Sequence, residues 1–219
     1  MARSMLVYQE FPDAAIGAAT LVGLHGRGGG LDQLVPLVRD IGPFQLIAPQ
    51  AARPVSPATQ GDSSSADGFT WFFIHEIGYP EPATFGEGLW LVEQFIYDVR
   101  DRQGDGRPMV LLGYEQGAVL AVTLAAVLPD MLAGVAAICG YWPDIRDWSP
   151  PAEEMGRLPV LLVHDSHDRE IPPDLADRTA SELKRRGASV ELQWVDGARQ
   201  NPLAAVATLR RWIDVSIPR

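Results

Sequence analysis

A chain of 219 residues, 47% hydrophobic and 21% charged, can bury one large core and is short for two full domains. Its 18 Lys and Arg residues against 28 Asp and Glu residues give a formal net charge of −10, which argues against nucleic acid or an anionic membrane surface as a partner. The single cysteine, Cys139, cannot form an internal disulfide and favours a reducing compartment. The N-terminal apolar run is too short for a secretion signal, and no run approaches the ~20 residues of a membrane span, so we expect a cytoplasmic protein.

Short apolar runs alternate along the chain with longer stretches of helical period. The expected strands are 5–8, 20–24, 45–48, 109–112, 134–138, 159–163 and 190–195, and the expected helices are 31–40, 87–101, 116–128, 174–186 and 203–215. Most strand runs are apolar on both faces, as in a parallel sheet covered by helices on both sides. The sequence therefore predicts a single α/β domain over residues 1–219, built on a mostly parallel, doubly wound sheet.

Two longer segments interrupt this alternation. Residues 50–70 are rich in Pro, Ser, Gly and Ala, and residues 144–156 contain Pro150-Pro151. The α/β pattern resumes after each of them, which indicates surface excursions rather than linkers. Excursions at strand ends often form the walls of a site.

Four segments together resemble a known family. LHGRGG at 24–29 is similar to the turn after an early strand in α/β-hydrolases of the phospholipase/carboxylesterase family, the bacterial relatives of acyl-protein thioesterases. GYEQG at 113–117 resembles the family's GFSQG nucleophile elbow, GYWP at 140–143 its SGxLP segment, and HDSHDREIP at 164–172 its HGxxDxxVP acid loop. The resemblance covers nearly the whole chain and implies an α/β-hydrolase fold.

The resemblance also assigns roles to individual residues. Gly113 and Gly117 would allow the sharp turn from strand to helix that exposes the central residue of the elbow. The backbone N–H groups of Gln116 and Arg27 would form the oxyanion hole. Asp168 matches the acid of the triad, which orients a histidine.

The nucleophile and the base of this family are both absent. Glu115 stands at the centre of the elbow, where the resemblance implies Ser. All four histidines of the chain precede Asp168, although the family order requires a histidine after it. The segment VDGARQN at 195–201 places either Arg199 or Gln200 at that position, and neither can shuttle a proton near neutral pH.

These two changes lead to a hypothesis about the site. We expect an ion cluster of Asp168, Arg199 and Glu115 to replace the triad, because a buried charge needs a partner and the two replacements carry opposite signs. A simpler alternative is that Glu115 only caps its helix and fills the oxyanion hole. A carboxylate nucleophile is a further alternative, but the second half-reaction would have no base.

The remaining candidates concern histidines and aromatic residues. His25 is interpreted as a residue that supports its turn. His164 and His167 lie beside two aspartates, which suggests a metal site, but the spacing of the two histidines disfavours it. We therefore expect no metal and no cofactor. An aromatic pocket wall for a small apolar or acyl ligand would include His25, Trp71, Tyr141 and Trp142. Core packing is favoured for Trp90.

Two functions of different class remain. The first is a hydrolase-fold protein that has lost serine catalysis and keeps its pocket for a ligand or a partner. The second is a divergent carboxylic-ester or thioester hydrolase that uses a non-standard site. The sequence leaves a homodimer open.

Overall fold

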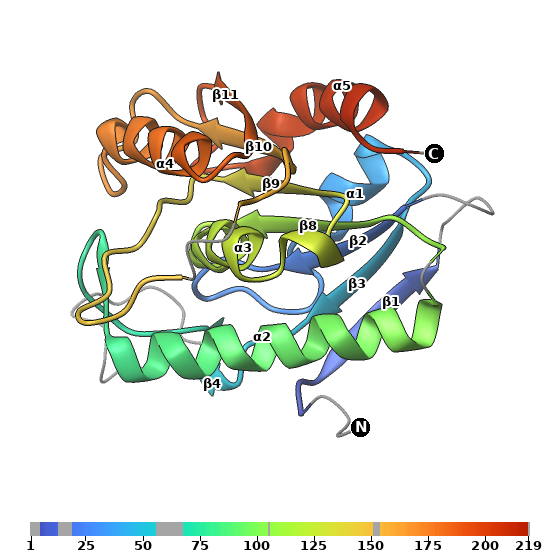
Figure 1. Ribbon diagram of the computed structural model, residues 1–219, viewed down its shortest axis with the longest axis horizontal. Coiled ribbons are helices and arrows are strands. Elements are labelled where there is room, and N and C mark those ends of the chain that lie inside the picture. The colour runs from blue at the N-terminus through green and yellow to red at the C-terminus, as the bar shows by residue number, and fades with distance from the viewer. Residues whose placement is uncertain (1–4, 13–18, 56–67, 105, 151–153, 219) are drawn as a thin grey trace.

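The computed structural model describes residues 5–12, 19–55, 68–104, 106–150 and 154–218. A seven-stranded sheet with the order β1-β3-β2-β8-β9-β10-β11 runs through the molecule (Figure 1). Its strands are β1 (Tyr8–Pro12), β2 (Thr20–Leu24), β3 (Gln45–Pro49), β8 (Met109–Tyr114), β9 (Gly134–Ile138), β10 (Pro159–His164) and β11 (Ser189–Trp194). The edge strand β1 pairs antiparallel with β3, and every other neighbouring pair is parallel, which confirms the mostly parallel sheet expected from the sequence.

Helices cover both faces of the sheet (Figure 1). On one face lie α2 (Pro82–Gln103), α3 (Gln116–Val127) and α4 (Pro173–Arg185), whose apolar side chains share one core with the sheet. On the other face lie α1 (Val35–Ile41) and α5 (Val206–Ser216), which form a second core. Two short 3₁₀ helices, η2 (Pro129–Met131) and η3 (Pro202–Ala205), complete the helical elements of the described residues. Helices on both faces bury every central strand, as the doubly wound pattern requires.

The sequence of the central helix α3 has no polar stripe. Its residues from Gln116 to Ala126 are all buried, because the helix lies between the sheet and α2. Helix α2 is the longest helix and begins at a capped end, where the Glu81 carboxylate accepts hydrogen bonds from the backbone N–H groups of Ala83 at 3.0 Å and Thr84 at 2.8 Å.

The expected bounds of four elements need correction. The helix expected at 87–101 is α2, which begins five residues earlier, at Pro82. The first strand was expected at 5–8, but β1 begins at Tyr8, because Met5 and Val7 are exposed by 73% and 62% and the pairing uses the polar edge residues that follow. Helix α1 begins at Val35 rather than at residue 31, and Pro36 stands in its first turn. The last expected helix is divided into η3 and α5, with Pro202 opening the first part.

The two excursions carry short strands and a turn. In the first, β4 (Arg53–Pro54) pairs with β5 (Phe69–Thr70), while residues 56–67 lie outside the described residues. A hairpin of β6 (Ile74–Glu76) and β7 (Tyr79–Pro80) follows. In the second, an isolated bridge joins Ile145 to Trp148, and residues 151–153 lie outside the described residues. None of the helices in the described ranges combines the length and the apolar character needed to cross a membrane.

Candidate functional site

The turn between β8 and α3 keeps the strained geometry of a nucleophile elbow. Glu115 has φ 50° and ψ −114°, a conformation that costs a non-glycine residue roughly 1–3 kcal/mol. Its backbone N–H donates to the Ile138 carbonyl at 2.9 Å, and its carbonyl accepts the Val119 N–H at 3.0 Å. A Cβ on Gly117 would collide with the Leu24 carbonyl oxygen, so only glycine allows this close approach. The strained turn therefore holds Glu115 at its centre, the position that the sequence resemblance assigns to a serine.

The Glu115 carboxylate points into the turn that follows β2. A Cβ built on Gly26 would lie 3.0 Å from its Oε2, and the nearby backbone N–H of Arg27 acts to lower the pKa of the carboxylate. That N–H is one of the two donors expected to form an oxyanion hole, so the carboxylate occupies part of the space where an oxyanion would lie. The side chain is only 14% exposed.

Arg199 lies between three carboxylates. Its Nη1 forms an ion pair with Glu115 Oε1, its Nη2 pairs with Glu170 Oε2, and its Nε lies 3.6 Å from Asp168 Oδ2. Its carbonyl oxygen accepts a hydrogen bond of 2.6 Å from the Tyr114 hydroxyl, which ties the loop after β11 to the elbow. Arg199 thus stands at the position facing Asp168, whereas Gln200 is exposed.

Asp168 is buried and fixed by its own loop. Its Oδ1 accepts the backbone N–H groups of Glu170 at 2.8 Å and Ile171 at 2.9 Å. Among the residues that the structure describes, its Oδ2 has no hydrogen-bond partner, nor has Arg199 Nε, because the 3.6 Å between these two atoms gives an ion pair without a hydrogen bond. One lone-pair direction of the acid therefore remains unused.

Burial and charge act in opposite directions on this cluster. Burial raises the pKa of Glu115 above its usual range, although the Arg199 guanidinium, the Tyr114 hydroxyl and the Arg27 N–H each act to lower it. For Arg199, burial alone would lower the pKa, but the carboxylates of Glu115 and Glu170 raise it above its ordinary value. The guanidinium is charged at any physiological pH and cannot accept a proton as a base.

The side chain of Gln116 has a structural role beside the elbow. Its Oε1 accepts from the Thr70 hydroxyl at 2.9 Å and from the Trp71 N–H at 3.1 Å, and its Nε2 donates to the Phe72 carbonyl at 2.8 Å. These three bonds anchor the segment after β5 on the start of α3. The sequence resemblance drew attention only to the backbone N–H of Gln116.

His25 is held in the neutral form by its surroundings. Its Nδ1 donates to the Gly26 carbonyl at 2.7 Å and its Nε2 accepts the Ala51 N–H at 3.0 Å, a pattern that fixes one tautomer. Burial lowers the pKa of His25 to about 4. The ring also packs against Trp71, with 4.9 Å between the ring centroids. His25 therefore supports the turn.

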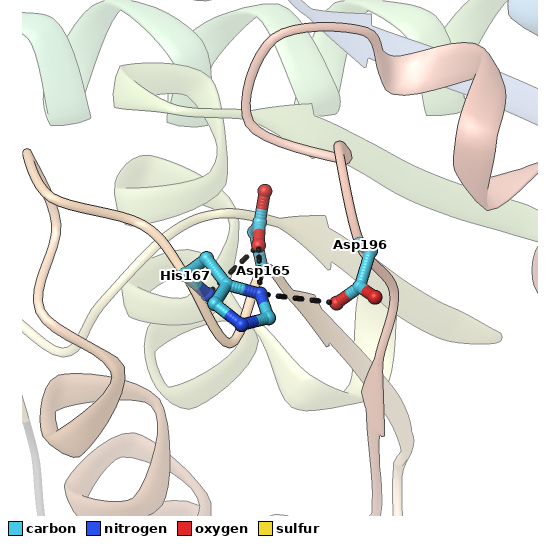
Figure 2. Close-up of side chains that lie close together, drawn as sticks. All are labelled: Asp165, His167 and Asp196. Atoms are coloured by element: carbon cyan, nitrogen blue, oxygen red, sulfur yellow. Dashed lines mark hydrogen bonds and ion pairs between the residues drawn. The ribbon is translucent and has the colours of Figure 1, made fainter.

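The acid loop and the loop after β11 meet in a cluster of Asp165, His167 and Asp196 (Figure 2). Asp165 accepts the backbone N–H of His167 through Oδ1 and that of Gly197 through Oδ2, both at 2.9 Å. The His167 Nδ1 lies 3.4 Å from Asp196 Oδ1, and both side chains are about four-fifths exposed, at 81% and 79%. The cluster joins the two loops that carry Asp168 and Arg199. His164, which the sequence placed beside His167, is not a member of this cluster, because its Nε2 bonds to the Ile171 carbonyl at 3.0 Å.

The aromatic wall expected from the sequence needs correction. His25, Trp71 and Tyr141 are each 1% exposed and belong to the interior. The Trp71 Nε1 donates to the His25 carbonyl at 2.8 Å, and the rings of these two residues pack against each other. Trp142 differs from these three because it lines a groove of ≈ 800 Å³. Trp90, expected in the core, is 48% exposed, because its helix turns Leu89, Leu91 and Val92 inward instead.

Comparison with known proteins agrees with this architecture. The family model described as phospholipase/carboxylesterase matches residues 17–216. The chain belongs to this family. Among curated relatives of the family, acyl-protein thioesterase 1 of Candida albicans is 25% identical over 187 residues, which are 77% of this chain and 78% of that protein. A 65-residue stretch is 40% identical to NocK of Nocardia uniformis, of which the chain covers only 17%.

Solved structures support the same α/β-hydrolase fold for this family member. The carboxylesterase of Mesorhizobium loti superposes with a TM-score of 0.77 at 24% identity, covering 96% of this chain and 95% of that one. The carboxylesterase of Bacillus cereus gives a TM-score of 0.79 at 16% identity over 98% and 96% of the two chains. At these identities the likeness concerns the fold alone.

Two parts of the site were missed by sequence reasoning. Glu170 supplies a third carboxylate to Arg199, and its position two residues after Asp168, in the acid loop, was the available signal. The Tyr114 hydroxyl holds the Arg199 carbonyl, a long-range contact that no motif indicates.

Proposed function

We propose that this member of the phospholipase/carboxylesterase family no longer catalyses ester hydrolysis and acts by binding a ligand. The observation that carries the proposal is the ion pair of Glu115 and Arg199, the two residues that the sequence resemblance aligns with a serine and a histidine. Serine catalysis requires a hydroxyl and a base that can take its proton. This pair offers a carboxylate and a permanently charged guanidinium.

The position of the Glu115 side chain supports the same proposal. The carboxylate lies against Gly26 and near the Arg27 N–H, so a substrate carbonyl would compete with a negative charge for the donor that should stabilise an oxyanion. Displacing the carboxylate would separate it from Arg199, at the cost of leaving the Glu115 charge without its partner.

A pocket nevertheless remains beside the cluster. The groove of ≈ 800 Å³ reaches Glu170, which pairs with Arg199, and its size falls in the range of small-molecule sites. Retained binding space beside a site that lacks nucleophile and base favours recognition over turnover.

The test measures turnover directly. Purified wild-type protein and Glu115→Gln are incubated with short-chain nitrophenyl esters and a short acyl thioester. We expect both proteins to release product at the same rate as a protein-free buffer. Release by the wild type that Glu115→Gln abolishes would overturn the proposal and favour a divergent hydrolase in which Glu115 takes part.

A further inference from the structure

The groove of ≈ 800 Å³ has three walls of different origin. They are the hairpin β6–β7, the loop that follows β9, and the start of α4. A hydrogen bond of 2.9 Å from the Asp144 N–H to the Gly78 carbonyl joins the first two walls, which lie side by side in Figure 1. Its apolar lining includes Ile77, Tyr79, Trp142, Ile145, Trp148 and Leu175. The groove can therefore bury an apolar body.

The charges that line the groove are mostly negative. Five carboxylates, from Glu76, Asp144, Glu170, Asp174 and Glu182, stand against one guanidinium, that of Arg178. Three of the carboxylates already have cationic partners: Glu170 pairs with Arg199, Asp174 with Arg178 at 3.1 Å, and Glu182 with Arg186 at 2.8 Å.

Glu76 and Asp144 differ from the other three. Both are exposed, and in the described part of the chain neither forms an ion pair with an arginine or lysine. Both also line an adjoining hollow of ≈ 610 Å³, together with Tyr79 and Arg146, so they stand where the two spaces meet. Two carboxylates that form no ion pair with an arginine or lysine of the described residues thus lie beside the apolar lining, in a protein whose formal net charge is −10.

The aromatic rings of the groove also favour a positively charged ligand. Tyr79 and Trp148 are exposed by 51% and 40%, and ring faces attract cations. Trp142 already makes such a contact, because the Arg186 guanidinium lies 4.7 Å from its ring centroid. Carboxylates and aromatic rings together form the environment in which proteins bind ammonium groups.

We propose that this groove binds an amphiphilic amine. The apolar body of the ligand packs against Trp142, Trp148 and Leu175, and its ammonium group lies near Glu76 and Asp144. A ligand with a carboxylate or phosphate in place of the ammonium is repelled by the same two residues. The inference rests on the proposed binding function and adds the chemical class of its ligand.

The experiment compares three probes that share an eight-carbon chain. Isothermal titration calorimetry measures the binding of octyltrimethylammonium, octanoate and octyl glucoside, each below its micelle concentration. We expect the ammonium probe to bind most tightly. Its affinity should fall as salt is raised from 20 to 150 mM, because salt screens the attraction between the ammonium and the surface carboxylates. Octanoate that binds as tightly as the ammonium, or no saturable binding of the ammonium, would overturn the proposal.

Paired variants separate local from overall charge. Glu76→Gln with Asp144→Asn removes two charges inside the groove, and Asp101→Asn with Asp130→Asn removes two exposed charges outside it. The groove variant is expected to weaken binding of the ammonium about tenfold, whereas the control changes it less than about twofold. Equal effects of the two variants would contradict the proposed position of the ammonium. If the double variant in the groove does not fold, the two single substitutions give the same comparison.

These results are independent of the turnover assay. A wild-type protein that hydrolyses esters and still prefers the ammonium probe would contradict the proposed loss of catalysis alone. A protein without turnover and without this preference would contradict the ligand class alone.

Discussion

The Arg199 guanidinium and the Glu115 carboxylate form an ion pair in which the two side chains are only 16% and 14% exposed. Residues 84 positions apart in the chain thereby join the elbow to the loop after β11. Removal of one member leaves the other charge poorly solvated, and an unpaired buried charge costs more than the pair itself contributes.

The first prediction concerns the stability that depends on this pair. Arg199→Met is expected to lower the free energy of unfolding by about 2–4 kcal/mol, because it leaves the Glu115 carboxylate without its guanidinium. Urea denaturation at pH 7 measures the change. The control is Arg211→Met, which breaks the exposed pair of Arg211 and Glu191 and should cost less than about 1 kcal/mol.

Addition of Glu115→Gln to Arg199→Met provides a second check on the same pair. The double variant should recover part of the lost stability, because the unpaired negative charge is gone. Equal destabilisation by Arg199→Met and Arg211→Met would show that the pair carries no special energetic role.

The second prediction concerns the anchor formed by Gln116. Gln116→Ala removes three hydrogen bonds to the segment of Thr70, Trp71 and Phe72, and we expect a loss of about 2–3 kcal/mol. In the native protein the Trp71 amide donates a hydrogen bond to Gln116 Oε1, so its hydrogen exchange should be faster in Gln116→Ala. The control is Gln193→Ala, which removes the hydrogen bond from the Gln193 side-chain amide to Glu191. This variant should leave the exchange of the Trp71 amide unchanged. Unaltered protection of the Trp71 amide in Gln116→Ala would refute the anchor.

The third prediction concerns stability at acidic pH. Burial lowers the pKa of His25 from 6.5 to about 4, so the folded protein holds this histidine neutral while the unfolded chain protonates it below about 6.5. The contribution of neutral His25 to the free energy of unfolding is therefore complete above pH 6.5 and is lost as the pH falls toward 4. Between pH 7 and pH 4.5, wild type should lose about 2–3 kcal/mol more than His25→Gln, measured by urea denaturation at each pH. Parallel losses in the two proteins would contradict the neutral, buried state of His25.

The sequence carried much of the fold because the strands of a doubly wound sheet are short apolar runs. The run Thr20–Leu24 is buried at every position, and its strand has the expected bounds. The edge strand was displaced, because the chain pairs residues such as Gln9 and Glu10, which a search for apolar runs passes over. An edge strand is stabilised by backbone pairing on one side, so its sequence is weakly constrained.

The candidate site was predictable in its members and less so in its contacts. Glu115 and Asp168 follow from two local motifs, each placed by a strand end. Arg199 needed the structure, because a one-residue change of alignment separates it from Gln200 in a loop without regular period. The groove could also be found only in the structure, because its walls come from segments far apart in the chain. Buried and exposed aromatic residues, moreover, look alike in a sequence.

The most direct measurement of the central claim is one hydrolysis assay on three proteins: wild type, Glu115→Gln, and Glu115→Ser combined with Arg199→His. The double variant places a serine on the strained elbow and a histidine beside the unused oxygen of Asp168, and removes the carboxylate from the Arg27 N–H. We expect it to release nitrophenol and to react with a fluorophosphonate probe, while wild type and Glu115→Gln remain at the rate of the buffer. Turnover by the wild-type protein that is lost in Glu115→Gln would contradict the claim.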